Sequence, residues 1–300
     1  MAFRNIIIEN PARISSKGSR IIISTDSEHS LPAEDISALM IENRSTTITA
    51  AALSQLGHGG CCVFICDEKH MPCAVLEPFS RHSRALSMLK AQIGASEALK
   101  KRLWQSIVMS KIKNQAECLK LNGLESDGEA IANLSGRVRS GDSENLEAVA
   151  AQKYFPALMG RGFTRANETA RNSALNYGYA IIRGCTARFL ALYGFAPALG
   201  LHHRSELNNF NLADDIMEPF RPVIDLIVST LVSDDDEELT PQMKRLLFNS
   251  LNLDIISGGQ HHSVAYAIER TVRSLSRSLS EGKAQLCLPE LIELSQHRYE

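Results

Sequence analysis

Short apolar runs separated by turn residues dominate the first 80 residues of the chain. Residues 6–8, 20–25, 46–49 and 61–67 are rich in isoleucine, valine and threonine, and glycine, asparagine or aspartate residues lie beside them. Runs of this composition are typical of β-strands. Residues 32–43 could form a short helix or a turn. Residues 50–60 predict a helix that ends at its glycines.

The pattern changes after Pro78. Residues 82–122 consist mainly of good helix formers, and apolar residues recur at helical spacing, as at Leu99, Leu103 and Ile107. This periodicity continues to the end, with breaks expected at residues 140–142, 160–162, 195–200, 233–240 and 257–259. The order predicts an α+β protein. It has a small N-terminal β-rich domain at residues 1–80, followed by a larger all-helical domain at residues 81–300.

Composition is that of an ordinary globular protein, with 44% hydrophobic and 22% charged residues in a chain of 300. No apolar run approaches the roughly 20 residues needed to span a membrane. The N-terminal residues do not resemble a signal peptide. Seven cysteines without a CxxC pair predict reduced thiols and a cytoplasmic protein. Residues 61–73 hold four of them, which we interpret as buried strand positions rather than a zinc site.

The net charge of −2 gives no overall preference for nucleic acid, but the charges are segregated. Residues 81–113 carry eight lysines and arginines against Glu97 alone, and residues 161–188 carry five arginines against Glu168. Acidic residues gather at 214–218 and 234–238. Such basic blocks either bind phosphates or are solvated helix faces, and composition favours neither.

One candidate for chemistry is Glu147, in a predicted helix for which Ser143 is a plausible N-cap. Apolar residues at helical spacing form a stripe along this helix, and Glu147 lies at its edge beside small residues. A carboxylate in that position is accessible to a bulky ligand. The alternative is a surface glutamate favoured by the helix dipole.

A second candidate is the segment that carries His202, His203, Asp214, Asp215 and Glu218. The three carboxylates lie on one side of a helical turn and repel one another, so a cation should compensate them. Arg221, a helix N-terminus or a metal ion would serve. Two prolines, at 219 and 222, predict a helix break near Glu218. Histidine with carboxylates suits a divalent cation, whereas a solvated acidic turn with packed histidines is the alternative. Neither HExxH nor GxSxG occurs.

A third segment places Arg270, Arg273 and Arg277 on one face of a predicted helix, as a row of phosphate contacts or a solvated face. The nearby pair His261 and His262 has few acids around it.

These residues resemble a known family along essentially the whole chain. The segments NLEAVAAQKYF, GLHHRSELNNFNLADDIMEPFRP, LWQSIVMSKIKNQA and ALNYGYAIIRG, in their order, are similar to the CRISPR-associated integrase. This is the larger subunit of the spacer-acquisition complex, and the likeness is to its type II version. The resemblance implies that Glu147, His203 and Glu218 are catalytic and bind Mg²⁺ or Mn²⁺. It also implies that Asp215 supports the site.

The implied reaction inserts short DNA fragments into a CRISPR array, in antiviral defence, by attack of a free 3′-hydroxyl at the leader–repeat junction. Weak metal-dependent nicking is also expected. Implied partners are double-stranded DNA, a second copy joined through the β-rich domain, and a small ferredoxin-like adaptation protein. A ring-shaped DNA-binding protein and the effector nuclease of type II systems are further candidates. We expect DNA contacts from these basic residues: Lys100, Lys101, Arg102, Arg165, Arg270, Arg273 and Arg277.

Two other functions fit parts of the sequence. A metal-dependent phosphohydrolase acting on nucleotides would share the His, Asp and Glu cluster but would not need the basic blocks. A non-catalytic DNA-binding scaffold would need the basic blocks but not an intact Glu147, His203 and Glu218.

Overall fold

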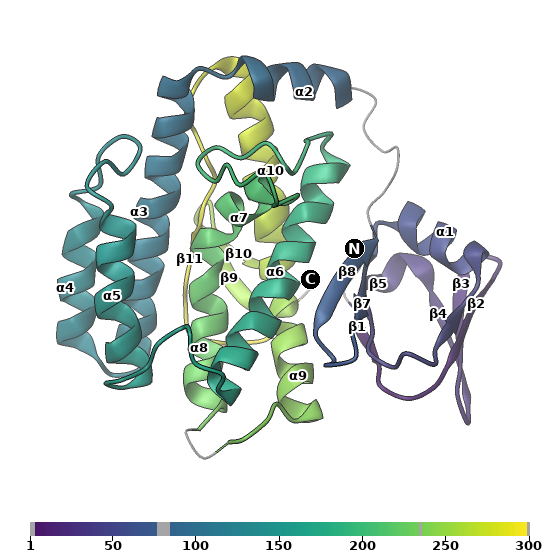
Figure 1. The fold of residues 1–300 in the computed structure, drawn as a ribbon. Coiled ribbons are helices and arrows are strands. Elements are labelled where there is room, and N and C mark those ends of the chain that lie inside the picture. The colour runs from purple at the N-terminus through teal and green to yellow at the C-terminus, as the bar shows by residue number, and fades with distance from the viewer. Residues whose placement is uncertain (1–3, 77–84, 234–235, 299–300) are drawn as a thin grey trace. The chain divides into compact units, whose positions relative to one another are not determined.

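The computed structural model describes residues 4–76, 85–233 and 236–298. Contacts divide the chain into an N-terminal unit, which ends at Arg81, and a second unit, which begins at His82. The first is rich in strands and the second in helices, as the sequence predicts, so the fold class is α+β (Figure 1).

Two four-stranded sheets build the N-terminal unit. One has the order β1-β5-β7-β8 and the other β4-β3-β2-β6. Isoleucines, leucines and valines from both sheets and from the helix α1 (Ala50–Gly59) share one buried core. The strands are β1 (Arg4–Ile8), β2 (Arg13–Lys17), β3 (Arg20–Ser24), β4 (Glu28–Pro32), β5 (Ile36–Ile41), β6 (Thr47–Ile48), β7 (Cys62–Cys66) and β8 (Pro72–Leu76).

The prediction of a helix or turn at residues 32–43 is wrong for most of that segment. Only Ala33–Asp35 forms a short 3-10 helix, η1, and Ile36–Ile41 is the strand β5. β5 pairs in parallel with β1 on one side and β7 on the other. A strand between two parallel neighbours is buried on both faces, so its sequence, ISALMI, is apolar except for Ser37 and lacks the alternation that would identify a strand.

The predicted helix at residues 50–60 is confirmed as α1 (Ala50–Gly59). The Thr49 side chain accepts a hydrogen bond from the backbone N–H of Ala52 and caps its start. Gly60 ends it in the left-handed conformation, with a φ of 83°, which a glycine adopts without steric cost.

Helices make up most of the second unit. They are α2 (Ala85–Gly94), α3 (Glu97–Leu121), α4 (Glu125–Ser135), α5 (Leu146–Met159), α6 (Ala170–Leu192), α7 (Asn211–Met217), α8 (Arg221–Leu231), α9 (Pro241–Phe248) and α10 (Val264–Glu281). The 3-10 turns η2 (Glu218–Phe220) and η3 (Asn249–Asn252) join some of them. Each break expected from the sequence falls between elements or at the end of one, apart from residues 234 and 235, which lie outside the described residues.

The long helix α3 is the centre of this unit. It packs against α4, α5 and α8, and α4 and α5 lie beside it in Figure 1. Leu103, Trp104 and Ile107 are among its fully or nearly fully buried residues. Because α3 is covered on several sides, its side chains reach both α5 and the turn η2, which carry the acidic residues of the candidate site.

The second unit also contains a small sheet that the helical pattern does not predict. Its order is β10-β9-β11, with β9 (Asp254–Ser257), β10 (Gln260–Ser263) and β11 (Pro289–Glu290). β11 comes from the C-terminal segment, so its pairing is a non-local contact that a short local pattern does not reveal.

None of the seven cysteines, all of which lie among the described residues, forms a disulfide bond. Cys61, Cys62 and Cys66 are buried at or in β7, whereas Cys73 on β8 is exposed, in contrast to its predicted buried position. Within residues 4–76, 85–233 and 236–298, no helix is both long and apolar enough to cross a bilayer.

Candidate active site

Glu147 lies in the first turn of α5 with its side chain 29% exposed. The helix start is capped by Asp142, not by Ser143 as predicted. The Asp142 carboxylate accepts hydrogen bonds from the backbone N–H groups of Leu146 and Glu147, at 2.9 and 3.0 Å. Asn145, in the left-handed conformation, turns the chain into the helix. This cap holds the backbone of Glu147 in place.

The ammonium of Lys111 lies between two carboxylates. Its Nζ is 2.5 Å from Oε1 of Glu147 and 2.5 Å from Oε2 of Glu218. Lys111 belongs to α3 and is only 7% exposed, and Glu218 is 4% exposed. Two glutamates that are distant in sequence therefore face one cation inside the protein.

Glu218 begins η2, where the chain passes from α7 to α8, and this confirms the predicted helix break. Its second oxygen, Oε1, lies 3.0 Å from Nε of Arg221. Burial alone would raise the pKa of Glu218, but Arg221 and Lys111 lower it below its ordinary value. Burial likewise lowers the pKa of Lys111, but the attraction of Glu218 and Glu147 is stronger. The net effect raises the pKa of Lys111 above its ordinary value. Both groups are charged at neutral pH.

The neighbouring acids Asp214 and Asp215 have partners of their own. Asp214 pairs with Arg183 of α6, whose Nε lies 2.7 Å from Oδ1. It also accepts a hydrogen bond from the Asn208 side chain. The three acids thus have separate partners, and Arg221, one of the three candidates for a compensating positive charge, pairs with Glu218. Lys111 and Arg183 come from helices whose sequence gives no sign of this role.

Asp215 is fully buried and holds the loop that carries His203. Its two oxygens accept hydrogen bonds from the backbone N–H groups of Leu201, His202 and His203. Oδ1 also lies 2.6 Å from Nδ1 of the His203 ring. A carboxylate on Nδ1 leaves Nε2 as the ring atom available to another ligand. The hydrogen bond to Asp215 raises the pKa of His203, against the opposing effect of partial burial.

His202, next to His203, faces a different partner. Its ring stacks on Trp104 with centroids 4.2 Å apart and an interplanar angle of 1°. Trp104 also meets the ring of His203 at an edge, at 5.8 Å. The family resemblance implies His203 as the ligand, and the two histidine rings meet edge to face with centroids 5.7 Å apart. Trp104 adds a packing contact that restrains His203.

A buried acid that the sequence analysis missed lies one turn beyond this cluster. Asp225 of α8 accepts hydrogen bonds from the hydroxyls of Tyr154 on α5 and Tyr179 on α6. Burial raises the pKa of Asp225 to about 6. Only the packing of three helices reveals this contact, because the three residues are far apart in sequence.

The donor set suits a divalent cation. Among the residues that the structure describes, no three His, Cys, Asp or Glu side chains are arranged to hold a metal ion together. The Lys111 ammonium lies between Glu147 and Glu218, so the two carboxylates are close enough to share one positive centre. His203 lies near enough for Glu218 to raise its pKa. Two carboxylates and an imidazole are ligands that Mg²⁺ and Mn²⁺ accept.

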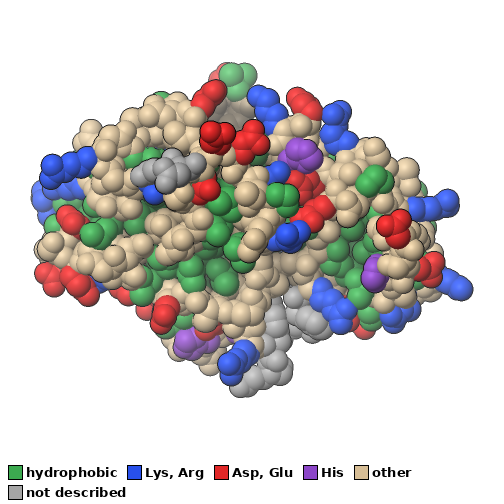
Figure 2. Space-filling model, turned by 90° about the horizontal axis from the view of Figure 1, so that it is seen from below, with side chains coloured by type: hydrophobic (Ala, Val, Ile, Leu, Met, Phe, Trp, Pro, Cys, Tyr) green, Lys and Arg blue, Asp and Glu red, His purple; other side chains and the backbone are tan. Residues whose placement is uncertain are grey.

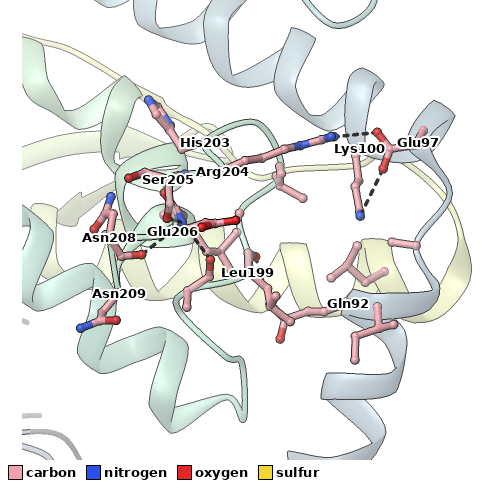
Figure 3. A pocket seen from close by; sticks show the side chains of 18 residues that line it. Gln92, Glu97, Lys100, Leu199, His203, Arg204, Ser205, Glu206, Asn208 and Asn209 are labelled. Carbon is pink, nitrogen blue, oxygen red and sulfur yellow. Dashed lines mark hydrogen bonds and ion pairs between the residues drawn. The ribbon is translucent and has the colours of Figure 1, made fainter.

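A cavity of about 530 Å³ opens beside His203. It is bordered by α2, the start of α3 and the loop at residues 198–211 (Figure 3). Figure 3 shows Lys100 and Arg204 turned toward Glu97, which lies 3.3 and 2.7 Å from their respective nitrogens. Of the predicted DNA contacts, Lys100 therefore lines a cavity next to the candidate site.

The other predicted DNA contacts lie in several places. Lys101 and Arg102 are exposed on α3. Arg165 donates hydrogen bonds to Asn172 and Asn176, so its guanidinium has structural partners. On the face seen in Figure 2, cationic and anionic side chains of the described residues are interspersed.

The predicted arginine row on α10 divides into two parts. Arg273 and Arg277 are exposed. Arg270 is partly buried, and its guanidinium lies against Gly258 and 3.7 Å from Sγ of Cys287. The nearby His261 and His297 both contact Asp254. Arg270 thus packs against neighbouring residues, whereas Arg273 and Arg277 are exposed to solvent.

Residues 6–243 match the family model described as CRISPR associated protein Cas1. The chain belongs to the Cas1 family. It is 44% identical, over the full length of both chains, to the CRISPR-associated endonuclease Cas1 of Neisseria meningitidis serogroup C. Glu147, Asp215 and Glu218 of this Cas1-family chain, and His203 beside them, all lie within the matched range.

Two solved structures share the Cas1 fold. A casposase bound to an integration product superposes with a TM-score of 0.74 at 20% identity, over 94% of this chain and 91% of the other. A chain of a Cas6-RT-Cas1–Cas2 complex gives a TM-score of 0.72 at 18% identity, over 96% of this chain and 36% of that one. At identities of 20% and 18%, these similarities show a common fold and nothing more.

Proposed function

We propose that this Cas1-family chain is a metal-dependent DNA integrase and endonuclease that inserts short DNA fragments into a CRISPR array. The observation that carries the proposal is the pair Glu147 and Glu218 on one shared cation, with His203 beside them. The relative from Neisseria is named an endonuclease, and the casposase structure holds an integration product. Both agree with chemistry on DNA phosphodiesters.

Glu147, His203 and Glu218 would hold Mg²⁺ or Mn²⁺. Carboxylate oxygens suit both ions, and an imidazole makes Mn²⁺ particularly acceptable. Asp215 is the supporting residue, because its bond to Nδ1 directs Nε2 of His203 toward a ligand. A divalent cation would supply Lewis-acid chemistry, favouring an ionised nucleophile and neutralising charge on the phosphate.

The proposed reaction is a transesterification. The 3′-hydroxyl of the incoming fragment attacks a phosphodiester at the leader–repeat junction. A new P–O bond forms while the bond to the departing oxygen of the array strand breaks, so no external energy source is required. With water as the nucleophile the same site would nick DNA. Glu147, His203 and Glu218 would hold the divalent cation next to the reacting phosphate, and Lys100 lines the same cavity as His203.

The proposed assembly has two copies of this chain, a small Cas2-type partner and double-stranded DNA. A Cas1–Cas2 complex among the solved structures with this fold supports a Cas2-type partner. The exposed cations Lys101, Arg102, Arg273 and Arg277 are candidates for phosphate contacts. A ring-shaped DNA-binding protein and an effector nuclease would join in a type II system.

A strand-transfer assay tests the proposal. A short duplex with free 3′-hydroxyls is mixed with a plasmid that carries leader and repeat, with Mn²⁺ and the small partner. Wild type should transfer strands, whereas His203→Ala and wild type with a chelator should not. His202→Ala is the matched control and should retain most activity, because its ring stacks on Trp104 and it is not one of the three proposed ligands.

Three results would contradict the proposal. Equal strand transfer by wild type and His203→Ala would contradict the assignment of His203 to the metal site. DNA binding by wild type without transfer would favour a non-catalytic scaffold. Hydrolysis of nucleotides in the absence of DNA, without strand transfer, would favour a phosphohydrolase.

A further inference from the structure

Four charges meet at the candidate site, and their signs balance. Glu147 and Glu218 are negative, and Lys111 and Arg221 are positive. Lys111 touches both carboxylates, whereas Arg221 touches only Glu218. Burying a charge without a partner is costly, so this balance is what allows Glu218 and Lys111 to be charged inside the protein.

A divalent cation on the same carboxylates changes that balance. If Lys111 stayed between them, the cluster would carry an excess of two positive charges in a largely buried environment. The ammonium also lies 2.5 Å from one oxygen of each glutamate, where a shared ion must approach. Charge and space therefore both oppose simultaneous binding.

Oε2 of Glu218 gives a second observation. This oxygen is buried and accepts no hydrogen bond of good geometry from the described residues, although it meets Lys111 as an ion pair. Oε1 of the same carboxylate is held by Arg221. When Lys111 moves away, Arg221 still orients Glu218 while Oε2 becomes available.

We propose that Lys111 is a displaceable internal cation, which holds Glu147 and Glu218 face to face and yields them to a divalent metal. The idea rests on the proposed function, because it assumes that these glutamates are metal ligands. It adds a role for a residue of α3 that the reaction does not require. Lys111 keeps the site assembled without metal and weakens metal binding, so only a cation that outcompetes an ammonium enters.

Mn²⁺ binding to the full-length protein tests this inference by isothermal titration calorimetry and thermal unfolding. Lys111→Met keeps the length of the side chain but removes its charge. We expect Lys111→Met to bind Mn²⁺ at least ~10-fold more tightly than wild type, since a competing charge about 4 Å or less from the ligands is removed. Its Tm should be lower without metal and should rise more on adding Mn²⁺.

Lys113→Met is the matched control, because Lys113 is exposed on the same helix. It should bind Mn²⁺ as wild type does. Binding that is no tighter in Lys111→Met than in Lys113→Met would overturn the role of Lys111. In that case the proposed function would still stand if wild type bound Mn²⁺ and His203→Ala did not. Absence of Mn²⁺ binding in wild type and both variants would overturn both proposals.

A crystal structure of wild type with Mn²⁺ tests the inference without relying on a variant. The anomalous signal should place Mn²⁺ between Glu147 and Glu218, with Nζ of Lys111 withdrawn from at least one carboxylate. Mn²⁺ bound there with Lys111 still 2.5 Å from both glutamates would rule out displacement.

Discussion

Gly200 and Asp215 approach each other so closely that no side chain fits between them. A Cβ atom on residue 200 would lie 2.9 Å from Oδ2 of Asp215 and still closer to the backbone oxygen of His203. Glycine at this position lets the loop fold over the buried carboxylate. A glycine three residues before His203 is therefore required for a steric reason, because the loop from Gly200 to His203 wraps around Asp215.

Gly200→Ala should therefore damage the site without touching a ligand. The added methyl would push the loop away from Asp215, and we expect a loss of about 1–3 kcal/mol in the free energy of unfolding. Mn²⁺ affinity should fall as well, because His203 moves. Denaturant unfolding and calorimetry measure the two effects. Gly94→Ala, where a Cβ meets nothing within 4 Å, is the control and should lower neither stability nor Mn²⁺ affinity.

Asp215→Asn should weaken Mn²⁺ binding by about 10- to 100-fold, the effect typical of a lost supporting carboxylate. An asparagine would point its NH₂ group at N–H donors of the loop, whichever way it is oriented. The loop would lose acceptors, and His203 would lose its fixed orientation. Asp214→Asn, which removes a partner of Arg183 instead, should change Mn²⁺ affinity far less. Equal losses in the two variants would contradict this role for Asp215.

Asp225 should make the stability of the protein fall as pH rises. Its pKa is about 6 in the folded protein against an ordinary value of 3.8. Between these pH values the folded state binds the proton more tightly than the unfolded state. The contribution of Asp225 to the free energy of unfolding is therefore fully present below pH 4 and is lost as pH rises through 6. The change is on the order of 3 kcal/mol.

Asp225→Asn removes this titration and can still accept a hydrogen bond from Tyr154 or Tyr179. Relative to wild type, the variant should gain about 3 kcal/mol in the free energy of unfolding between pH 4 and pH 7. Urea unfolding at these pH values measures the difference. If the difference in the free energy of unfolding between wild type and variant did not change with pH, Asp225 would not titrate in this range.

DNA binding should depend on the exposed cations in proportion to their number. Replacing Arg273 and Arg277 by alanine should lower affinity similarly for all sequences. It should also reduce the slope of log affinity against log salt by about 1 for each phosphate that the protein no longer neutralises. Lys101→Ala with Arg102→Ala tests α3 in the same way. Arg165→Ala provides a contrast, because Arg165 is bonded to Asn172 and Asn176. An unchanged salt slope in the α10 double variant would exclude that helix from the interface.

The sequence by itself determined those features that depend on neighbours along the chain. The helix α1 ends at Gly60 because only local backbone geometry is involved. The break at Glu218 follows from Pro219 and Pro222. The order of strands and then helices indicated the fold class. For Glu147, His203 and Glu218, local spacing left the metal site and the solvated alternatives open, and resemblance to a family selected them.

Only the tertiary structure decided the contacts between distant segments. Lys111 comes from α3, and nothing in its helical repeat distinguishes a buried cation from a solvated one until α5 and η2 pack against it. The strand β5 was missed because burial on both faces removes the alternation of polar and apolar residues. Tyr154, Tyr179 and Asp225 meet only where three helices converge. Ion pairs, buried hydrogen bonds and strand pairing join residues across space, so a local pattern does not encode their partners.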